Sequence, residues 1–290
     1  MTHVVCTLVV AGGMLFGVDE ASGQFGVPIT DPAPLNNNAE SDNAEDLQPR
    51  LALDGACHWV AVWWSDENLD GIGTDWDILV ARSSDCGTTW TDPAPLNVNA
   101  ASDTGDDTAA DVATDGAGNW VVVWDSNDSL EGTHNIGDDT DILVARSSDN
   151  GATWTDPVPL NHNAPGGNGG DTGGQDFDIR PRIATDREGH WVVVWDSAED
   201  IGGIGTDQDV LVARSSDNGA TWSAPATLNG NAATDAGDDF YPRLATDGVG
   251  QWIATWYSLE DLGGTLGVDS DILVARSTDN GANWTAPAAL

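Results

Sequence analysis

Short apolar runs separated by polar turns recur along most of the chain. From Pro242 to Ser258, a run of alternating apolar residues, a tight Asp/Gly turn and a second apolar run follow one another, and the segment from Pro181 to Ser197 has the same order. This pattern predicts a β-hairpin of two antiparallel strands.

Four later segments share almost one sequence, and their turn aspartates lie 62 to 68 residues apart. The segments are DILVARSSDCGTTW (Asp77 to Trp90), DILVARSSDNGATW (Asp141 to Trp154), DVLVARSSDNGATW (Asp209 to Trp222) and DILVARSTDNGANW (Asp271 to Trp284). Each begins with a run that predicts a third strand. The proline-containing run that follows the tryptophan predicts an edge strand, because proline cannot donate to a central ladder.

Four strands in each repeated unit match the size of one propeller blade. The sequence therefore predicts an all-β fold, a β-propeller of four-stranded antiparallel blades, over residues 24–290. The blades are expected at approximately residues 48–97, 109–161, 180–229 and 242–290.

The turn after each third strand has the pattern Ser-x-Asp-x-Gly-x-x-Trp. Four copies in register resemble the Asp box, or BNR repeat, of the sialidase-like propellers. In that family the box joins the third and fourth strands of a blade, on the face opposite the active site. We expect the turn aspartates to stabilise the fold, because a repeated turn residue has the same task in every copy; they are Asp85, Asp149, Asp217 and Asp279.

The resemblance implies six blades in a closed ring, whereas this sequence shows four. Two interpretations stay open: a sequence that stops inside a longer array, and a closed four-bladed propeller. In both, the loops from strand 4 to strand 1 and from strand 2 to strand 3 share one face, which we call the long-loop face. Function is expected there, because long surface loops on a rigid scaffold carry most binding sites.

The charge of the chain is strongly negative. Nine arginines, no lysine and 48 acidic residues give a formal net charge of −39 at pH 7. Nucleic acid is therefore excluded as a natural partner, since its phosphates repel such a surface. Most of the acidic residues are Asp, which favours turns and oxygen ligation over helices.

The N-terminal segment predicts export. Residues 1–23 contain a short apolar stretch that ends in Ala21-Ser22-Gly23, the length and small-residue ending of a signal peptide, although without a basic beginning. No later segment has the roughly 18 continuous apolar residues of a membrane span. We therefore expect a secreted protein with no membrane attachment beyond this leader.

Calcium is the one cofactor that the sequence suggests. Closely spaced Asp carboxylates and glycine-rich loops provide the oxygen ligands that Ca²⁺ binds. Pairs of aspartates recur at the start of every third strand: Asp75 and Asp77, Asp139 and Asp141, Asp207 and Asp209, Asp269 and Asp271. The alternative is that they cap strands on a solvated acidic surface.

The sialidase resemblance also implies a catalytic site, as an alternative function. Sialidases use three arginines to hold the substrate carboxylate, with an Asp as acid and a Tyr–Glu pair as nucleophile. Equivalent positions of the first strands carry Arg50, Asp111, Arg182 and Arg243. The three arginines would form the clamp, Asp111 the acid, and Tyr241 or Tyr257 the nucleophile. The other interpretation is that each arginine pairs with a loop aspartate.

Recognition without catalysis is the function that we expect first. Trp64 and Tyr257 occupy one equivalent position at the long-loop end of the second strand, where aromatic rings suit sugar stacking. The expected partner is a carbohydrate or an extracellular protein. If the chain is an enzyme, we expect a sialidase-like glycoside hydrolase. The sequence indicates no oligomeric state.

Two of the three cysteines stand at unusual places. Cys57 replaces the turn glycine of the other repeats, and Cys86 replaces the asparagine of their Asp boxes. Both fall in same-face turns of the first blade. They predict a disulfide, which an exported protein can keep; two free thiols are the alternative.

Overall fold

The computed structural model describes residues 33–36, 39, 43–130, 136, 139–161, 177–267 and 269–290. The predicted leader, residues 1–23, lies outside them. Residues Leu35–Leu290 form one compact unit, which contains every strand of the fold. No helix among the described residues is long and apolar enough to cross a membrane.

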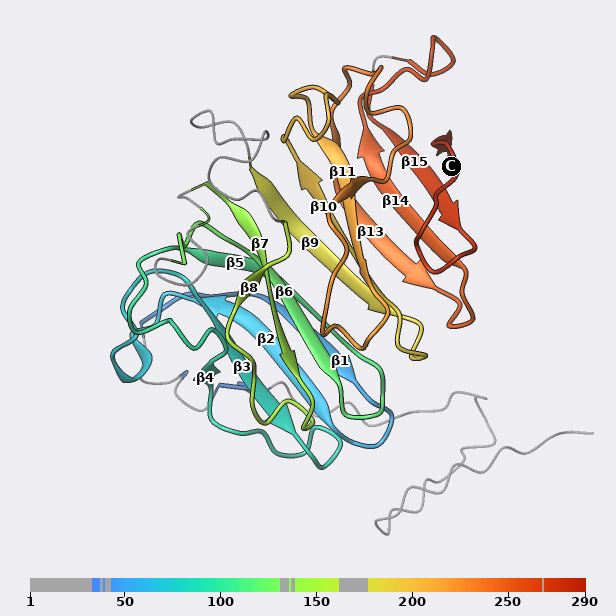
Figure 1. The fold of residues 1–290 in the computed structure, drawn as a ribbon. Coiled ribbons are helices and arrows are strands. Elements are labelled where there is room, and N and C mark those ends of the chain that lie inside the picture. The colour runs from blue at the N-terminus through green and yellow to red at the C-terminus, as the bar shows by residue number, and fades with distance from the viewer. Residues whose placement is uncertain are drawn as a thin grey trace, which may run out of the picture. The chain divides into compact units, whose positions relative to one another are not determined.

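This unit consists of four antiparallel sheets of four strands each, coloured in chain order in Figure 1. Blade 1 contains β1 (Asp46–Leu53), β2 (Trp59–Ser65), β3 (Asp77–Ser83) and β4 (Ala94–Pro95), and blade 2 contains β5 (Asp107–Thr114), β6 (Trp120–Ser126), β7 (Asp141–Ser147) and β8 (Val158–Pro159). Blade 3 contains β9 (Asp178–Thr185), β10 (Trp191–Ser197), β11 (Asp209–Ser215) and β12 (Ala226–Thr227), and blade 4 contains β13 (Asp239–Thr246), β14 (Trp252–Ser258), β15 (Asp271–Ser277) and β16 (Ala288–Ala289). The predicted all-β fold of four-stranded blades is confirmed.

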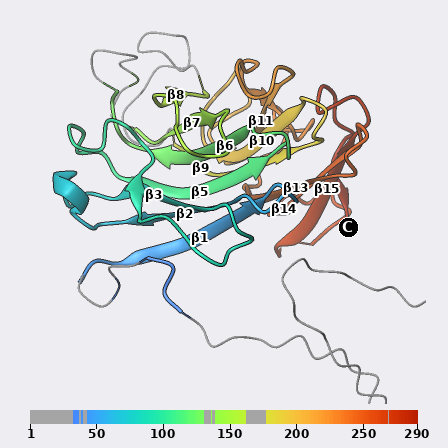
Figure 2. The ribbon, with the colours of Figure 1, turned by 90° about the horizontal axis from the view of Figure 1, so that it is seen from below.

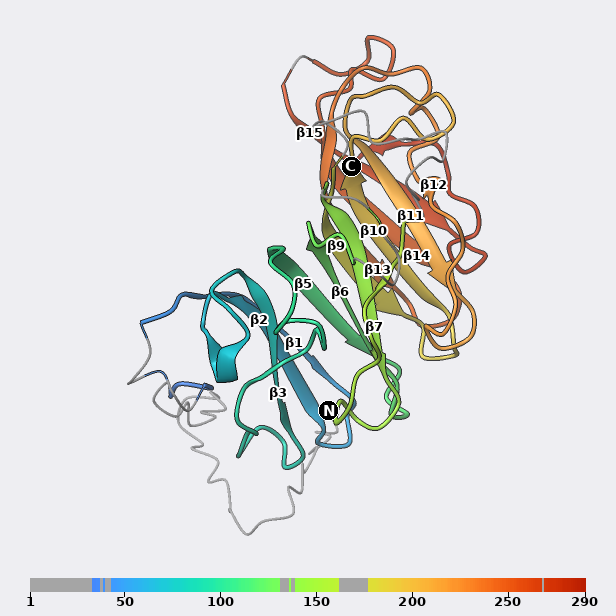
Figure 3. The same ribbon diagram turned by 60° about the vertical axis from the view of Figure 1, so that its left-hand side comes forward.

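Neighbouring blades pack face to face through their apolar residues. Figures 2 and 3 show the arrangement of the sheets from two further directions. The first strands lie innermost, with β1 packed on β5, β5 on β9 and β9 on β13. Strands β1 and β13 are not packed on each other in this way in the described part of the chain. The two interpretations of the sequence, part of a longer array and a closed four-bladed ring, therefore both stay untested. A short 3-10 helix, η1 (Leu69–Gly71), lies in the loop between β2 and β3.

The repeated tryptophans of the second strands form the core. In blade 3, Trp191 and Trp195 are fully buried, and they pack with Val121 and Val123 of blade 2. The same contact recurs at each junction because the alternating residues of a strand point to opposite faces of its sheet. These tryptophans are buried in both positions in blades 2 to 4, whereas Trp59 of blade 1 is only partly buried.

Each Asp box is a hydrogen-bonded turn. In blade 3, Asp217 accepts hydrogen bonds from the backbone N–H of Thr221 at 2.9 Å and from its hydroxyl at 2.6 Å. The Ser215 hydroxyl donates to Asp217 at 2.8 Å and accepts from the Gly219 N–H at 3.0 Å. The Gly219 φ of 75° explains why glycine stands there, and a methyl group in its place would lie 2.7 Å from Val121 of blade 2. The box therefore also sets how closely neighbouring blades approach.

A disulfide joins Cys57 and Cys86, as the sequence predicts. It connects the turn between β1 and β2 with the Asp box between β3 and β4, 29 residues further along the chain. Their backbones are already joined by a hydrogen bond from the Cys86 N–H to the Cys57 carbonyl at 3.2 Å. The bond therefore covalently fixes two turns of blade 1 that are neighbours in space.

Every innermost strand contains a β-bulge at one register. Two residues of the inner strand lie opposite a single tryptophan of the next strand, and the first of the two has a positive φ between 47° and 59°. The four residues with this φ are Gln48, Ala109, Arg180 and Tyr241. A bulge of this kind bends the strand and redirects a side chain. All four bulges lie near the long-loop end.

Candidate functional site

The four sequence-predicted charged residues of the inner strands follow the bulges directly. Their register positions are equivalent: Arg50 pairs with Val62 and Arg182 with Val194, and Asp111 and Arg243 take the same place in blades 2 and 4. Arg50 Nε lies 3.9 Å from Asp111 Oδ1. Burial lowers the pKa of Arg182. The negative charge of Asp111 acts against this shift, and the positive charges of Arg243 and Arg50 add to it. The structure therefore brings the four residues into one electrostatic cluster.

The three arginines of this cluster share a local contact. Arg182 Nη1 donates to the carbonyl of Pro181 at 2.6 Å, Arg243 Nη1 to that of Pro242 at 2.9 Å, and Arg50 Nη1 to that of Pro49 at 3.3 Å. In each case the proline is the second residue of the bulge. Arg182 is only 9% exposed. A contact repeated in three blades indicates that the guanidinium groups hold the bulge.

Asp111 connects two blades. Its Oδ2 accepts a hydrogen bond from the Ile183 backbone N–H, which belongs to β9 of the next blade, at 3.0 Å. Burial raises the pKa of Asp111, while this hydrogen bond and the neighbouring Arg182 and Arg50 act in the opposite direction. Its carboxylate is thus held by the protein on both oxygens.

An exposed aromatic group lies beside this cluster in blade 4. Tyr241 and Tyr257 are 44% and 46% exposed, and their ring centroids are 6.0 Å apart with the planes nearly perpendicular. Phe240 contacts both rings. The Arg180 guanidinium of blade 3 lies 4.0 Å from the Tyr241 ring centroid, which is the geometry of a cation–π contact.

Asp196 of blade 3 fixes this aromatic group in place. Its Oδ2 pairs with Arg180 Nη1 at 3.1 Å and accepts from the Tyr241 backbone N–H at 3.2 Å. Burial raises its pKa to about 6, although Arg180 opposes the shift. Neither Arg180 nor Asp196 was predicted from the sequence as a site residue. The signal for Arg180 was the variable bulge position, which is recognised only when the register of the inner strand is known.

Two acidic triads stand on the same face. Each consists of carboxylates whose ligand oxygens lie within 4.8 Å of one another, and each could hold a metal ion; the triads are Asp75, Asp77 and Asp103, and Asp207, Asp209 and Asp235. Burial raises the pKa of Asp103 to about 7, and repulsion from Asp77 and Asp128 adds to it. The predicted pairs Asp139/Asp141 and Asp269/Asp271 are not part of such a triad within the described residues.

The third member of each triad was not predicted. Asp103 and Asp235 lie in the loops from strand 4 to the next strand 1. A repeated word, Leu-Asn-x-Asn-Ala-x-x-Asp, ends on both of them, at residues 96–103 and 228–235. This word was the available signal, and its role became apparent only once the fold placed the two loops together.

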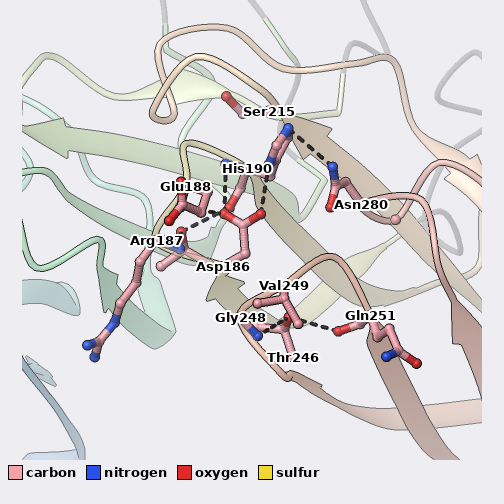
Figure 4. Close-up of polar contacts among 12 residues, drawn as sticks. Asp186, Arg187, Glu188, His190, Ser215, Thr246, Gly248, Val249, Gln251 and Asn280 are labelled. Atoms are coloured by element: carbon pink, nitrogen blue, oxygen red, sulfur yellow. Dashed lines mark hydrogen bonds and ion pairs between the residues drawn. The ribbon is translucent and has the colours of Figure 1, made fainter.

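Carboxylates on the opposite face have structural partners. In the turn between β9 and β10, Asp186 Oδ2 contacts His190 Nδ1 at 2.7 Å, and Asp186 Oδ1 accepts from the Glu188 and His190 N–H groups (Figure 4). The other ring nitrogen of His190 lies 3.3 Å from Asn280 Nδ2 in the Asp box of blade 4. These groups close a turn and contact the next blade, which is a role in the fold.

Solved structures share this fold. A Penicillium chrysogenum alpha-L-arabinanase complexed with arabinobiose matches with a TM-score of 0.55 and 18% sequence identity, over 84% of this chain and 66% of that one. The intramolecular trans-sialidase from Ruminococcus gnavus matches with a TM-score of 0.54 and 12% identity, over 85% and 71% of the two chains. A protein of unknown function from Dyadobacter fermentans matches with a TM-score of 0.56 and 16% identity, over 86% and 70%.

These likenesses show a sialidase-like propeller fold with Asp-box turns. The chain spans 66% of the arabinanase and 37% of a Trypanosoma rangeli sialidase, so it corresponds to part of each. No protein-family model and no curated protein matches the sequence.

Proposed function

We propose that this chain, which has the fold of the sialidase-like propellers, is a secreted carbohydrate-recognition module. The observation that carries the proposal is the exposed pair Tyr241 and Tyr257 with the Arg180 guanidinium packed on Tyr241. Aromatic rings provide flat apolar faces for a sugar ring, and a guanidinium provides several hydrogen-bond donors for its hydroxyl or carboxylate groups.

The site is preorganised for such a ligand. Asp196 holds both the Arg180 side chain and the Tyr241 backbone, so little conformational freedom is lost on binding. The solved structures of similar fold include an arabinanase with a bound arabinobiose and several sialidases, which act on carbohydrates. That similarity supports a sugar as the ligand class, and an extracellular protein is the other partner that the test below distinguishes.

Hydrolysis of a sialoside is the second candidate. The convergence of Arg50, Arg182 and Arg243 around Asp111 favours it. Against it, the guanidinium groups donate to proline carbonyls of their own bulges, and Asp111 already accepts an N–H from the next blade. We therefore rank recognition above catalysis.

Export and calcium complete the proposal. A disulfide between Cys57 and Cys86 is typical of proteins from oxidising compartments. The net charge of −39 and the two acidic triads favour divalent cations as counter-ions on the long-loop face. Calcium suits these groups because all of them offer carboxylate oxygen.

The test is glycan binding by the full chain in calcium-containing buffer, with Tyr241→Ala and Tyr257→Ala as variants. Each should weaken binding about tenfold or more, since truncation of an aromatic hot-spot residue costs about 2 kcal/mol or more. Val249→Ala is the matched control, because Val249 is 81% exposed in a turn on the opposite face.

Three outcomes separate the candidates. Binding that depends on both tyrosines supports recognition of sugars. Binding of a protein ligand alone, or glycan binding that neither variant changes, would overturn the proposal. Turnover of a fluorogenic sialoside that Arg182→Ala abolishes, in a variant that remains folded, would establish the hydrolase instead.

A further inference from the structure

Each acidic triad is assembled from two loops on the long-loop face. In blade 1, Asp75 lies at the end of the loop between β2 and β3, Asp77 begins β3, and Asp103 comes from the loop between β4 and β5. In blade 3, Asp207 and Asp209 precede and begin β11, and Asp235 lies between β12 and β13. The ligand oxygens of each triad lie within 4.8 Å of one another.

Each triad contains a buried carboxylate oxygen that has no hydrogen-bond partner among the described residues. Asp77 is fully buried; its Oδ1 accepts from Asn97 Nδ2 at 3.0 Å, and its Oδ2 has no partner within the described residues. Asp209 is 1% exposed, accepts from Asn229 Nδ2 at 2.7 Å on Oδ1, and likewise has no partner for Oδ2 there. A buried anionic oxygen left without a partner is costly, so an ionic ligand is the natural complement.

Asp103 and Asp235 repeat this division between a hydrogen-bonded oxygen and an available one. Asp103 Oδ2 accepts from Asn99, and Asp235 Oδ2 accepts from Asn231. In the described chain, the Oδ1 atoms of Asp103 and Asp235 have no partner, nor do the Oδ2 atoms of Asp75 and Asp207. The same atoms are therefore available in two blades whose triad loops have nearly the same sequence, GIGTDWD and LNVNAASD in blade 1 and GIGTDQD and LNGNAATD in blade 3.

The two loops of each triad are already connected across a blade junction. The Asp107 N–H, at the start of β5 in blade 2, donates to the Trp76 carbonyl in blade 1 at 2.7 Å. At the junction of blades 3 and 4, the Asp239 N–H donates to the Gln208 carbonyl at 2.6 Å. A cation held by either triad would therefore join a blade to the segment that leads into the next one.

We propose that each triad binds one Ca²⁺, so that the chain carries two calcium sites, at the junctions of blades 1 and 2 and of blades 3 and 4. Calcium takes oxygen ligands at about 2.3–2.6 Å, which fits oxygens no further than 4.8 Å apart around a single ion. Backbone carbonyls and water complete its preferred six to eight ligands. This inference rests on the cation requirement of the proposed function and is independent of the identity of the glycan.

The test is calorimetric titration of Ca²⁺ into the full chain after removal of divalent ions with chelator. Two sites are expected in the wild-type chain and one in each of Asp103→Asn and Asp235→Asn. Asp269→Asn is the matched control, because Asp269 stands at the equivalent position of blade 4 outside any described triad, and it should retain two sites. Circular dichroism checks that each variant is folded, and Asp75→Asn replaces Asp103→Asn if the latter is not.

Terbium luminescence assigns the sites individually. Trp76 lies between Asp75 and Asp77 in the sequence, whereas Gln208 stands between Asp207 and Asp209. A Tb³⁺ ion at the first site should be sensitised by Trp76, and Asp103→Asn should abolish that signal. Asp235→Asn should leave it intact, as should Asp269→Asn.

Four results would overturn the proposal. They are no calcium binding by the wild-type chain, an unchanged number of sites in both triad variants, loss of a site in Asp269→Asn, or Mg²⁺ binding at least as tight as Ca²⁺. Failure here is separate from failure of the recognition proposal. Glycan binding that survives the loss of both calcium sites would retain the recognition proposal. Two calcium sites in a chain that binds no glycan would retain the calcium proposal.

Discussion

Replacement of Asp111 tests whether the charged cluster at the inner strands serves the fold or a reaction. Asp111→Ala removes the acceptor of the Ile183 N–H and the partner of Arg50. A partly buried N–H left without a partner costs about 1–3 kcal/mol. The nearly buried Arg182 also loses a compensating charge, so the free energy of unfolding should fall by about 2–4 kcal/mol in total.

Asp111→Asn separates the two contributions. The amide oxygen still accepts the Ile183 N–H, while the negative charge beside Arg50 and Arg182 is lost. We expect a smaller loss of about 1 kcal/mol. Stability should therefore fall in the order wild type, Asp111→Asn, Asp111→Ala.

The assay is urea unfolding followed by tryptophan fluorescence, which reports on the buried rings of the core. When the unfolding free energy falls with urea concentration at the same slope in both proteins, a lower midpoint of unfolding measures lost stability. Sialoside turnover is measured on the same samples. An Asp111→Ala variant with the wild-type midpoint would refute the structural role, and a turnover lost in a fully stable Asp111→Asn variant would point to an acid catalyst.

Three further predictions concern the blades themselves. Gly219→Ala should lower the free energy of unfolding by about 1–3 kcal/mol, because the left-handed φ and the contact with Val121 leave no place for a methyl group. Gly230→Ala is the control, because Gly230 has open space around it. Equal effects of the two substitutions in urea unfolding would contradict the prediction. Replacing Cys57 and Cys86 together by serine should cost about 3 kcal/mol, because the unfolded chain loses a 29-residue cross-link; an unchanged melting temperature under oxidising conditions would speak against it. In calcium-free buffer, stability should be greatest between about pH 4 and 6. Hydrogen bonds lower the pKa of Asp85 and Asp279 to about 2, so their contribution is present above 3.8 and lost as the pH falls towards 2. Burial raises the pKa of Asp196 to about 6, so its contribution is present below 3.8 and lost as the pH rises through 6; a melting temperature that climbs steadily from pH 4 to 8 would contradict the assignment.

The blades could be predicted because their signals are local and repeated. A hairpin pattern, a DILVAR strand and an Asp box follow one another in each copy, and period-2 alternation decides which face is buried. The disulfide followed from the same logic, since Cys57 and Cys86 replace equivalent turn residues of the other blades.

The site could be predicted only in part, for reasons of geometry. The contact of Arg180 with Tyr241 joins two blades through bulge residues, and a bulge changes the register by one residue, which alternation alone does not reveal. The triads needed Asp103 and Asp235 from separate loops, whose proximity to the predicted aspartate pairs is a property of the fold. The predicted arginines do converge, although their donation to proline carbonyls requires the actual conformation of the bulge.

The bulge position combines a constant backbone with a changing side chain. The backbone there has the same left-handed conformation in all four blades, yet the side chains are an amide, a methyl group, a guanidinium and a phenol, at Gln48, Ala109, Arg180 and Tyr241. The tryptophan opposite each bulge is the same in every copy, so exchange at this position leaves the core composition untouched. Four variable positions allow a large number of combinations on one scaffold. In the recognition module that we propose, ligand preference can thus evolve by single codon changes, without any insertion or new loop.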